Sequence, residues 1–85
     1  MPITYANDIR PKLRAGDINC MTPKGYRIGD AAWMCDPAAN NGFADHGNAR
    51  HVYTVIASGQ MPPDNAWPAA WLQTYQDWMN GGFSP

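Results

Sequence analysis

The segment from Gly59 to Pro68 constrains the fold more than any other part of this chain. It reads Gly-Gln-Met-Pro-Pro-Asp-Asn-Ala-Trp-Pro and separates two stretches whose apolar residues recur at helical spacing. Glycine is favoured just after a helix, and proline is favoured at the first position of one. Because two further prolines stiffen the backbone in between, the segment predicts a sharp corner that presents Met61.

The N-terminal stretch predicts a first helix. Thr4 or Asn7 can cap it, and Asn7 is the better cap because Pro11 would then lie in the first turn. There the missing N–H of proline has no intrahelical partner to lose. Gly16 is expected to end this helix.

The middle of the chain, residues 17–47, lacks a long periodic run and is expected to be irregular. Within it, Asp30 can cap a short helical turn. An irregular span of this length is typical of a functional segment or of one that wraps around something. The second main helix is expected over residues 48–58, with Asp45 or Asn48 as its cap.

The last helix is expected from about Pro68 to Asn80. Its apolar stripe at helical spacing consists of Trp71, Leu72, Tyr75, Trp78 and Met79. Gly81 and Gly82 are expected to end the helix, and Phe83 can fold back onto its last turn. Together these elements predict an all-α domain of three to four helices.

Length, composition and charge bound what the chain can be. Its 85 residues form one domain, residues 1–85, near the lower end of what folds alone. The formal net charge of −1 argues against a nucleic-acid-binding protein, which would carry a basic face. No apolar run is long enough to span a membrane and no signal sequence is visible, so the expected location is the cytoplasm.

The two cysteines, Cys20 and Cys35, leave two alternatives open. A disulfide between them would close a loop of about 15 residues and contribute about 3 kcal/mol. In a reducing cytosol two free thiols are expected instead. Either cysteine could also serve as a nucleophile, but no base is oriented toward it by sequence spacing.

Soft and imidazole side chains make a metal or haem site a hypothesis to weigh. The candidate ligands are Met61, Met21, Cys20, His46 and His51. Thiolate and thioether would suit Cu(I), and histidine with methionine could hold a non-covalent haem. However, the two histidines are five residues apart, which is poor spacing for one helix face, and no Cys-x-x-Cys spacing exists. The competing interpretation is that Met61 and Cys20 are core residues and that both histidines are surface or capping residues.

Three tryptophans, Trp67, Trp71 and Trp78, are candidates for an interaction surface. Exposed tryptophan is a typical anchor of protein interfaces. A small core can also absorb such rings, because each buries on the order of 150–250 Å². Core filling and partner binding are therefore the two interpretations of this aromatic excess.

Three pieces of the chain resemble the class I cytochrome c domain. They are the Asp-Ile-Arg-Pro-Lys-Leu start at residues 8–13, the Gly-Gln-Met-Pro-Pro corner at 59–63, and the final helix at 72–82. In that family a Cys-x-x-Cys-His motif attaches haem and supplies one axial ligand, and the corner methionine, which Met61 matches, supplies the other. Here residues 17–21 contain one cysteine and no following histidine. The resemblance thus implies a cytochrome c-like fold without covalent haem, its hollow filled by large side chains.

These observations favour a non-catalytic accessory or protein-interaction module, for example a small subunit of a larger enzyme. It would bind a partner protein, neither nucleic acid nor membrane, and would need no cofactor. The alternative is an electron-transfer protein that binds haem or copper through Met61. A third hypothesis is a small enzyme that uses Cys20 or Cys35.

Overall fold

The computed structural model describes residues 3–40, 42–59 and 66–85. The helices along these residues are the π-helix η1 (Tyr5–Ile9), the 3₁₀-helix η2 (Arg10–Lys12), α1 (Ala15–Met21), the 3₁₀-helix η3 (Thr22–Lys24), α2 (Ala31–Met34), α3 (Gly47–Ala57) and α4 (Ala69–Asn80). In these ranges the β-structure is a single isolated bridge between Asn40 and Phe43. The predicted all-α class is therefore confirmed.

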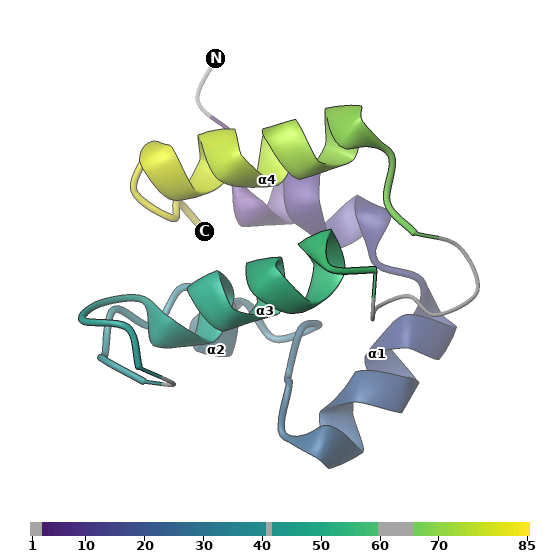
Figure 1. Cartoon of the computed structure of the whole chain (residues 1–85), viewed down its shortest axis with the longest axis horizontal. Helices are drawn as coiled ribbons and strands as arrows, with labels where there is room; N and C mark the ends of the chain where they lie inside the picture. The colour runs from purple at the N-terminus through teal and green to yellow at the C-terminus, as the bar shows by residue number, and fades with distance from the viewer. Residues whose placement is uncertain (1–2, 41, 60–65) are drawn as a thin grey trace.

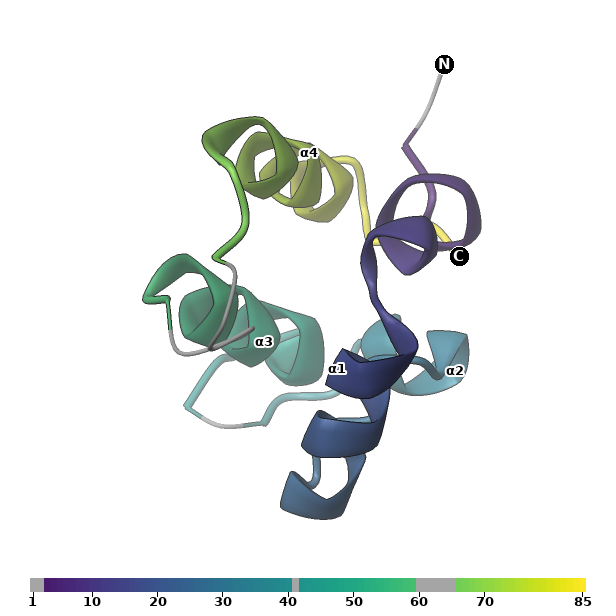
Figure 2. The same cartoon turned by 90° about the vertical axis from the view of Figure 1, so that its right-hand side faces the viewer.

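Helices α3 and α4 lie side by side and run in opposite directions (Figure 1). Helix η1 also packs against α4, and α2 packs against α3. Helix α1 lies at the edge of the molecule far from α4 (Figure 2). The two ends of the chain are tied together, because the N–H of Tyr5 donates to the carbonyl of Ser84 at 2.8 Å.

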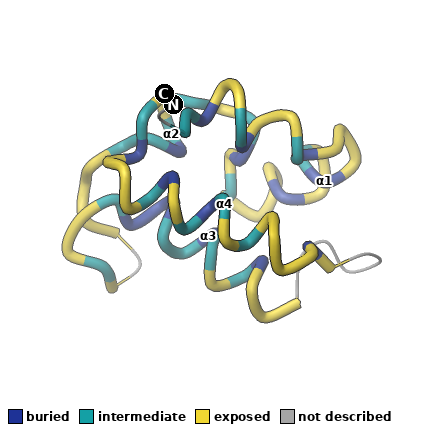
Figure 3. The backbone as a smooth tube through the Cα atoms, turned by 90° about the horizontal axis from the view of Figure 1, so that it is seen from above, coloured by how far each residue is buried: buried dark blue, intermediate teal, exposed yellow. Residues whose placement is uncertain are grey.

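The core lies between these helices and is dominated by aromatic rings. Trp78 and Tyr75 on α4 are fully buried and pack edge-to-face, with ring centroids 5.2 Å apart. Tyr5 and Phe83 contact Trp78 from two further segments. Every α-helix contributes buried residues to the interior, whereas exposed residues line the outer surface (Figure 3).

The start of the first helix differs from the prediction. Thr4, not Asn7, is the cap: its hydroxyl accepts from the N–H of Asn7 at 3.1 Å, and its own N–H donates to Asp8 at 2.9 Å. This reciprocal pair satisfies the first turn of η1. Pro11 does not require Asn7 as the cap, because it lies in the first turn of a separate 3₁₀ helix, where its missing N–H is equally harmless.

The prediction that Gly16 ends the first helix is wrong. The chain breaks earlier, at Leu13 and Arg14, which are both extended, and Gly16 lies inside α1. Residues 17–47 are consequently less irregular than expected, since they hold most of α1 and all of η3 and α2. The predicted cap of α2 is confirmed: Asp30 accepts a hydrogen bond from the N–H of Ala32 at 3.0 Å.

Neither Asp45 nor Asn48 caps α3. His46 occupies the cap position with φ +46° and makes no side-chain cap bond. Asn48 is buried within the first turn, where it accepts from the Asn40 amide and donates to the carbonyl of Trp33. The predicted end of α3 is confirmed, because Gly59 is left-handed with φ +82°.

The predicted end of α4 is also confirmed. The N–H of Gly82 donates to the carbonyl of Met79, and that of Phe83 donates to the carbonyl of Trp78, each at 3.1 Å. These two bonds form a Schellman motif, with Gly82 left-handed at φ +101°. The Phe83 ring then packs against Trp78. At the other end, Pro68 is the residue before the helix rather than its first residue.

Candidate functional site

The predicted metal or haem ligands do not converge in the described part of the chain. Met61 lies outside the described residues. Met21 is buried on α1, whereas Cys20 beside it is exposed. Residues 3–40, 42–59 and 66–85 contain no group of three or more His, Cys, Asp or Glu that could hold a metal ion.

Each histidine is engaged by neighbouring side chains. The Nδ1 of His46 lies 2.8 Å from a carboxylate oxygen of Asp45, and its ring stacks on Phe83 with centroids 3.8 Å apart. The Nε2 of His51 lies 2.9 Å from the hydroxyl of Tyr26, and these two rings also stack. Both histidines therefore join segments of the fold, His46 from the residue before α3 and His51 from within it.

The two cysteines are free thiols in the structure, so the optional Cys20–Cys35 bridge is not formed. Burial raises the pKa of the Cys35 thiol above its ordinary value. A nucleophilic cysteine needs the opposite shift, because the thiolate is the reactive species. The shift at Cys35 therefore disfavours its thiolate form.

Of the three tryptophans predicted as interaction residues, two are in the core. Trp78 is 0% exposed and Trp67 is 7% exposed, so neither offers a surface to a partner. Their rings fill the interior around Tyr75. Trp71 is 40% exposed and is the large hydrophobic residue that stands out on the described surface.

The Trp71 ring is held from two sides. It meets the buried Trp67 ring edge-on, with centroids 5.5 Å apart and planes at 88°. The Nζ of Lys12 lies 5.6 Å from the ring centroid. That ammonium is itself fixed, because it donates to the carbonyl of Asp8 at 2.8 Å. The exposed ring is therefore positioned before any partner arrives.

The neighbours of Trp71 in the chain extend this exposed area. Ala66, Pro68, Ala69 and Ala70 are all exposed and none carries a charge. We call these four residues, together with Trp71 and Lys12, the Trp71 surface. These four neighbours have small side chains, so the indole of Trp71 is the largest apolar group in this exposed stretch.

Sequence reasoning missed Lys12 as a member of this site. Lys12 is far from Trp71 along the chain, and no local pattern pairs them. The packing of η1 against α4 brings the following turn, η2, over the tryptophan. This contact depends on the tertiary structure alone.

Comparisons with protein-family models, with curated proteins and with solved structures gave no match for this chain. The resemblance to the class I cytochrome c domain therefore stays a prediction that rests on its motifs. Among the described helices, none has the length and the apolar content needed to cross a bilayer.

Proposed function

We propose that this protein is a non-catalytic interaction module that binds a partner protein through the Trp71 surface. The observation that carries the proposal is the 40% exposure of Trp71, on a fold that buries Trp67 and Trp78 almost completely. Tryptophan is among the residues that most often dominate binding energy at protein interfaces. A small subunit or accessory domain needs such an anchor and no catalytic group.

The fixed position of the Trp71 ring supports this function energetically. Binding normally costs about 0.5–1.5 kcal/mol for each flexible side chain that becomes immobilised. Because Trp67 and Lys12 already hold the ring, little of this cost remains to be met on association. The matching partner surface is an apolar pocket for the indole, with an acidic group near Lys12.

The test compares two substitutions on α4. Trp71→Ala removes the anchor, and Gln73→Ala changes an exposed residue of the same helix outside the Trp71 surface. The wild-type chain is immobilised on a support and incubated with an extract of its native host. It should retain a partner protein in stoichiometric amount. With that partner purified, Trp71→Ala should raise the dissociation constant of the complex by at least about 30-fold, equivalent to roughly 2 kcal/mol.

Gln73→Ala should bind as the wild type does, and both variants should keep the helical circular-dichroism spectrum. Equal affinity of the wild type and Trp71→Ala for the partner would overturn the proposal. An absorption spectrum of the natively expressed protein provides an independent check. A haem Soret band, or stoichiometric copper, would favour the electron-transfer hypothesis with Met61 as ligand instead.

A further inference from the structure

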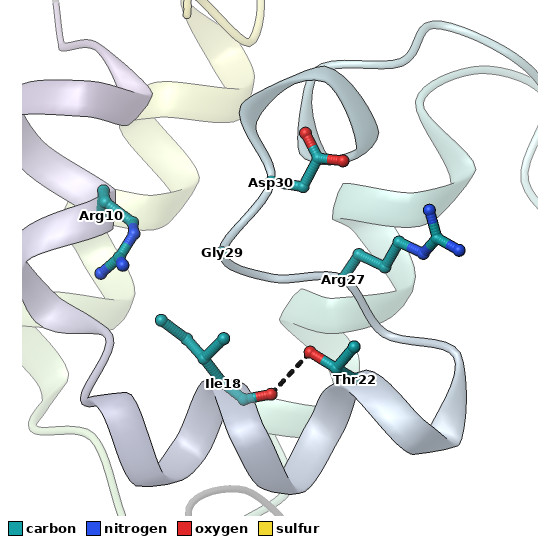
Figure 4. Close-up of a pocket in the computed structure, with 6 residues that line it drawn as sticks. All are labelled: Arg10, Ile18, Thr22, Arg27, Gly29 and Asp30. Carbon is teal, nitrogen blue, oxygen red and sulfur yellow. Dashed lines mark hydrogen bonds between the residues drawn. The ribbon is translucent and has the colours of Figure 1, made fainter.

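A pocket separate from the Trp71 surface lies between α1 and the segment that leads into α2. It has a volume of about 340 Å³. Its lining residues are Arg10, Ile18, Thr22, Arg27, Gly29 and Asp30 (Figure 4). This volume falls at the small end of the range for ligand sites.

One wall of the pocket is apolar. The Ile18 side chain rises from α1 toward Gly29 on the opposite segment (Figure 4). A Cβ atom at position 29 would lie 3.0 Å from the Cγ2 of Ile18, closer than such atoms normally approach. Glycine therefore allows the two segments to come this near, and the butyl group of Ile18 forms a surface for an apolar body.

Arg10 supplies the charged end. Its guanidinium extends from η2 toward the side chain of Ile18 (Figure 4). One nitrogen of this group, Nη1, makes a long bond of 3.4 Å to the carbonyl of Leu13. That bond is long and engages one nitrogen, and the planar guanidinium has five N–H donors in an arrangement that suits a carboxylate.

The remaining charged groups leave the pocket electropositive. Arg27 lines the opposite side and carries a second positive charge, with its guanidinium turned away from Arg10 (Figure 4). The single carboxylate, Asp30, already caps α2 through its bond to the N–H of Ala32. The Thr22 hydroxyl donates to the carbonyl of Ile18 at 2.7 Å, so its proton is also in use. With two arginines against one aspartate, the lining has an excess of positive charge, which favours an anionic ligand.

We propose that this pocket binds a small organic monocarboxylate, with the carboxylate on Arg10 and a short alkyl chain against Ile18. Arg27 attracts the anion to the mouth of the pocket without being its main partner. The Trp71 surface plays no part in this contact. The two proposals can therefore fail separately.

Amide NMR titration of the folded chain with hexanoate tests the proposal. Saturable shifts should centre on the amides of Ile18 and Gly29, with a dissociation constant on the order of 1 mM, which is typical for so small a ligand. Arg10→Gln should weaken binding by at least about tenfold through loss of a charge-assisted hydrogen bond. Arg50→Gln, which removes the same charge from α3, should leave the dissociation constant within about twofold.

Two further probes separate the charged and the apolar contact. Hexylamine should not shift the pocket amides, and acetate should bind more weakly than hexanoate by at least about tenfold, because it lacks the alkyl chain. The proposal is overturned if hexylamine binds as hexanoate does, if acetate matches hexanoate, or if Arg10→Gln has no effect. Shifts that centre on Trp71 instead of Gly29 would also overturn it.

Discussion

Among the residues that the structure describes, His46 and Phe83 have a backbone conformation that residues other than glycine rarely adopt. Their φ angles are +46° and +57°. Each such residue costs about 1–3 kcal/mol, and the cost is tolerated only where the surroundings favour that conformation strongly. Here the two rings stack with planes 3° apart, and the Arg50 guanidinium lies over Phe83 at 5.2 Å. The stack thus joins the start of α3 to the end of α4.

Substitutions at Phe83 separate the strain from the packing. Phe83→Ala removes a buried ring and should reduce the free energy of unfolding by about 3 kcal/mol. Phe83→Gly removes the same ring but adopts positive φ freely, so it should be more stable than Phe83→Ala by about 1 kcal/mol. Urea unfolding followed by circular dichroism gives both values. A glycine variant less stable than the alanine variant would contradict the strain argument.

We expect Asp45 to contribute to the stability of the fold in a way that depends on pH. Hydrogen bonds from His46 and then from Arg50 lower the pKa of this carboxyl below its usual 3.8. As the pH falls, the Asp45 carboxyl therefore binds a proton in the unfolded chain before it does so in the folded one. The stabilisation by its negative charge is present above about pH 4 and is lost below it. The urea midpoint of Asp45→Asn should lie below that of the wild type at pH 5, and the difference should shrink at pH 3.

Because Asp45 is exposed, this difference should be modest and should decrease in high salt. The same difference at pH 5 and pH 3 would show that the Asp45 side chain acts by packing or polarity rather than by its charge.

At the scale of helices, the sequence predicts ends better than beginnings. Gly59 and the Gly81-Gly82 pair mark the ends of α3 and α4 correctly, since only glycine adopts a left-handed turn without cost. Gly16 was misassigned because a glycine inside a short helix carries the same local signal as a terminating one. The dihedral angles of Leu13, which decide the matter, depend on the packing of its buried side chain.

Two glycine substitutions should therefore have opposite effects. Gly16 lies in α1 with open space around its α-carbon, so Gly16→Ala should stabilise the protein by up to about 1 kcal/mol. Gly82 has φ +101°, so Gly82→Ala should destabilise it by about 1–2 kcal/mol although nothing would touch the new methyl group. Thermal unfolding of both variants checks the pair. Destabilisation by Gly16→Ala would indicate that residue 16 is not helical.

The Trp71 surface could be predicted only in part, because the sequence does not show which tryptophan on or near α4 is exposed. Trp71 and Trp78 are seven residues apart, so the sequence places them on one face of the helix. Tyr5 and Phe83 cover that face at Trp78 but not at Trp71. Trp67, which precedes the helix, turns back onto Tyr75. Which tryptophan is exposed depends on neighbours from distant parts of the chain, and periodicity carries no information about them.

For the molecule as a whole, hydrogen bonds from buried tyrosines join segments that are far apart in the sequence. The Tyr5 hydroxyl donates to the carbonyl of Ile28, joining η1 to the segment before α2. The Tyr75 hydroxyl donates to the carbonyl of Ala49 at 2.7 Å, joining α4 to the first turn of α3. Because both hydroxyls are buried and satisfied, each must stay protonated while the fold is intact.

This requirement predicts a loss of stability in alkali. Burial raises the pKa of Tyr5 to about 12 and that of Tyr75 well above its usual 10. Above pH 10 the unfolded chain releases these protons first, so the free energy of unfolding should fall steadily as the pH rises toward 12. At pH 8, Tyr5→Phe and Tyr75→Phe should each cost about 1 kcal/mol, because a buried hydrogen bond is lost.

Above pH 10 the two phenylalanine variants should lose stability less steeply than the wild type, since each has one fewer proton to release on unfolding. Urea midpoints at pH 8, 10 and 11 give the slopes, and tyrosinate absorbance reports ionisation in the same samples. The combined Tyr5→Phe/Tyr75→Phe variant should have the shallowest slope. If all four proteins lose stability in parallel, the alkaline transition belongs to other groups, and the two tyrosines stabilise the fold through their rings alone.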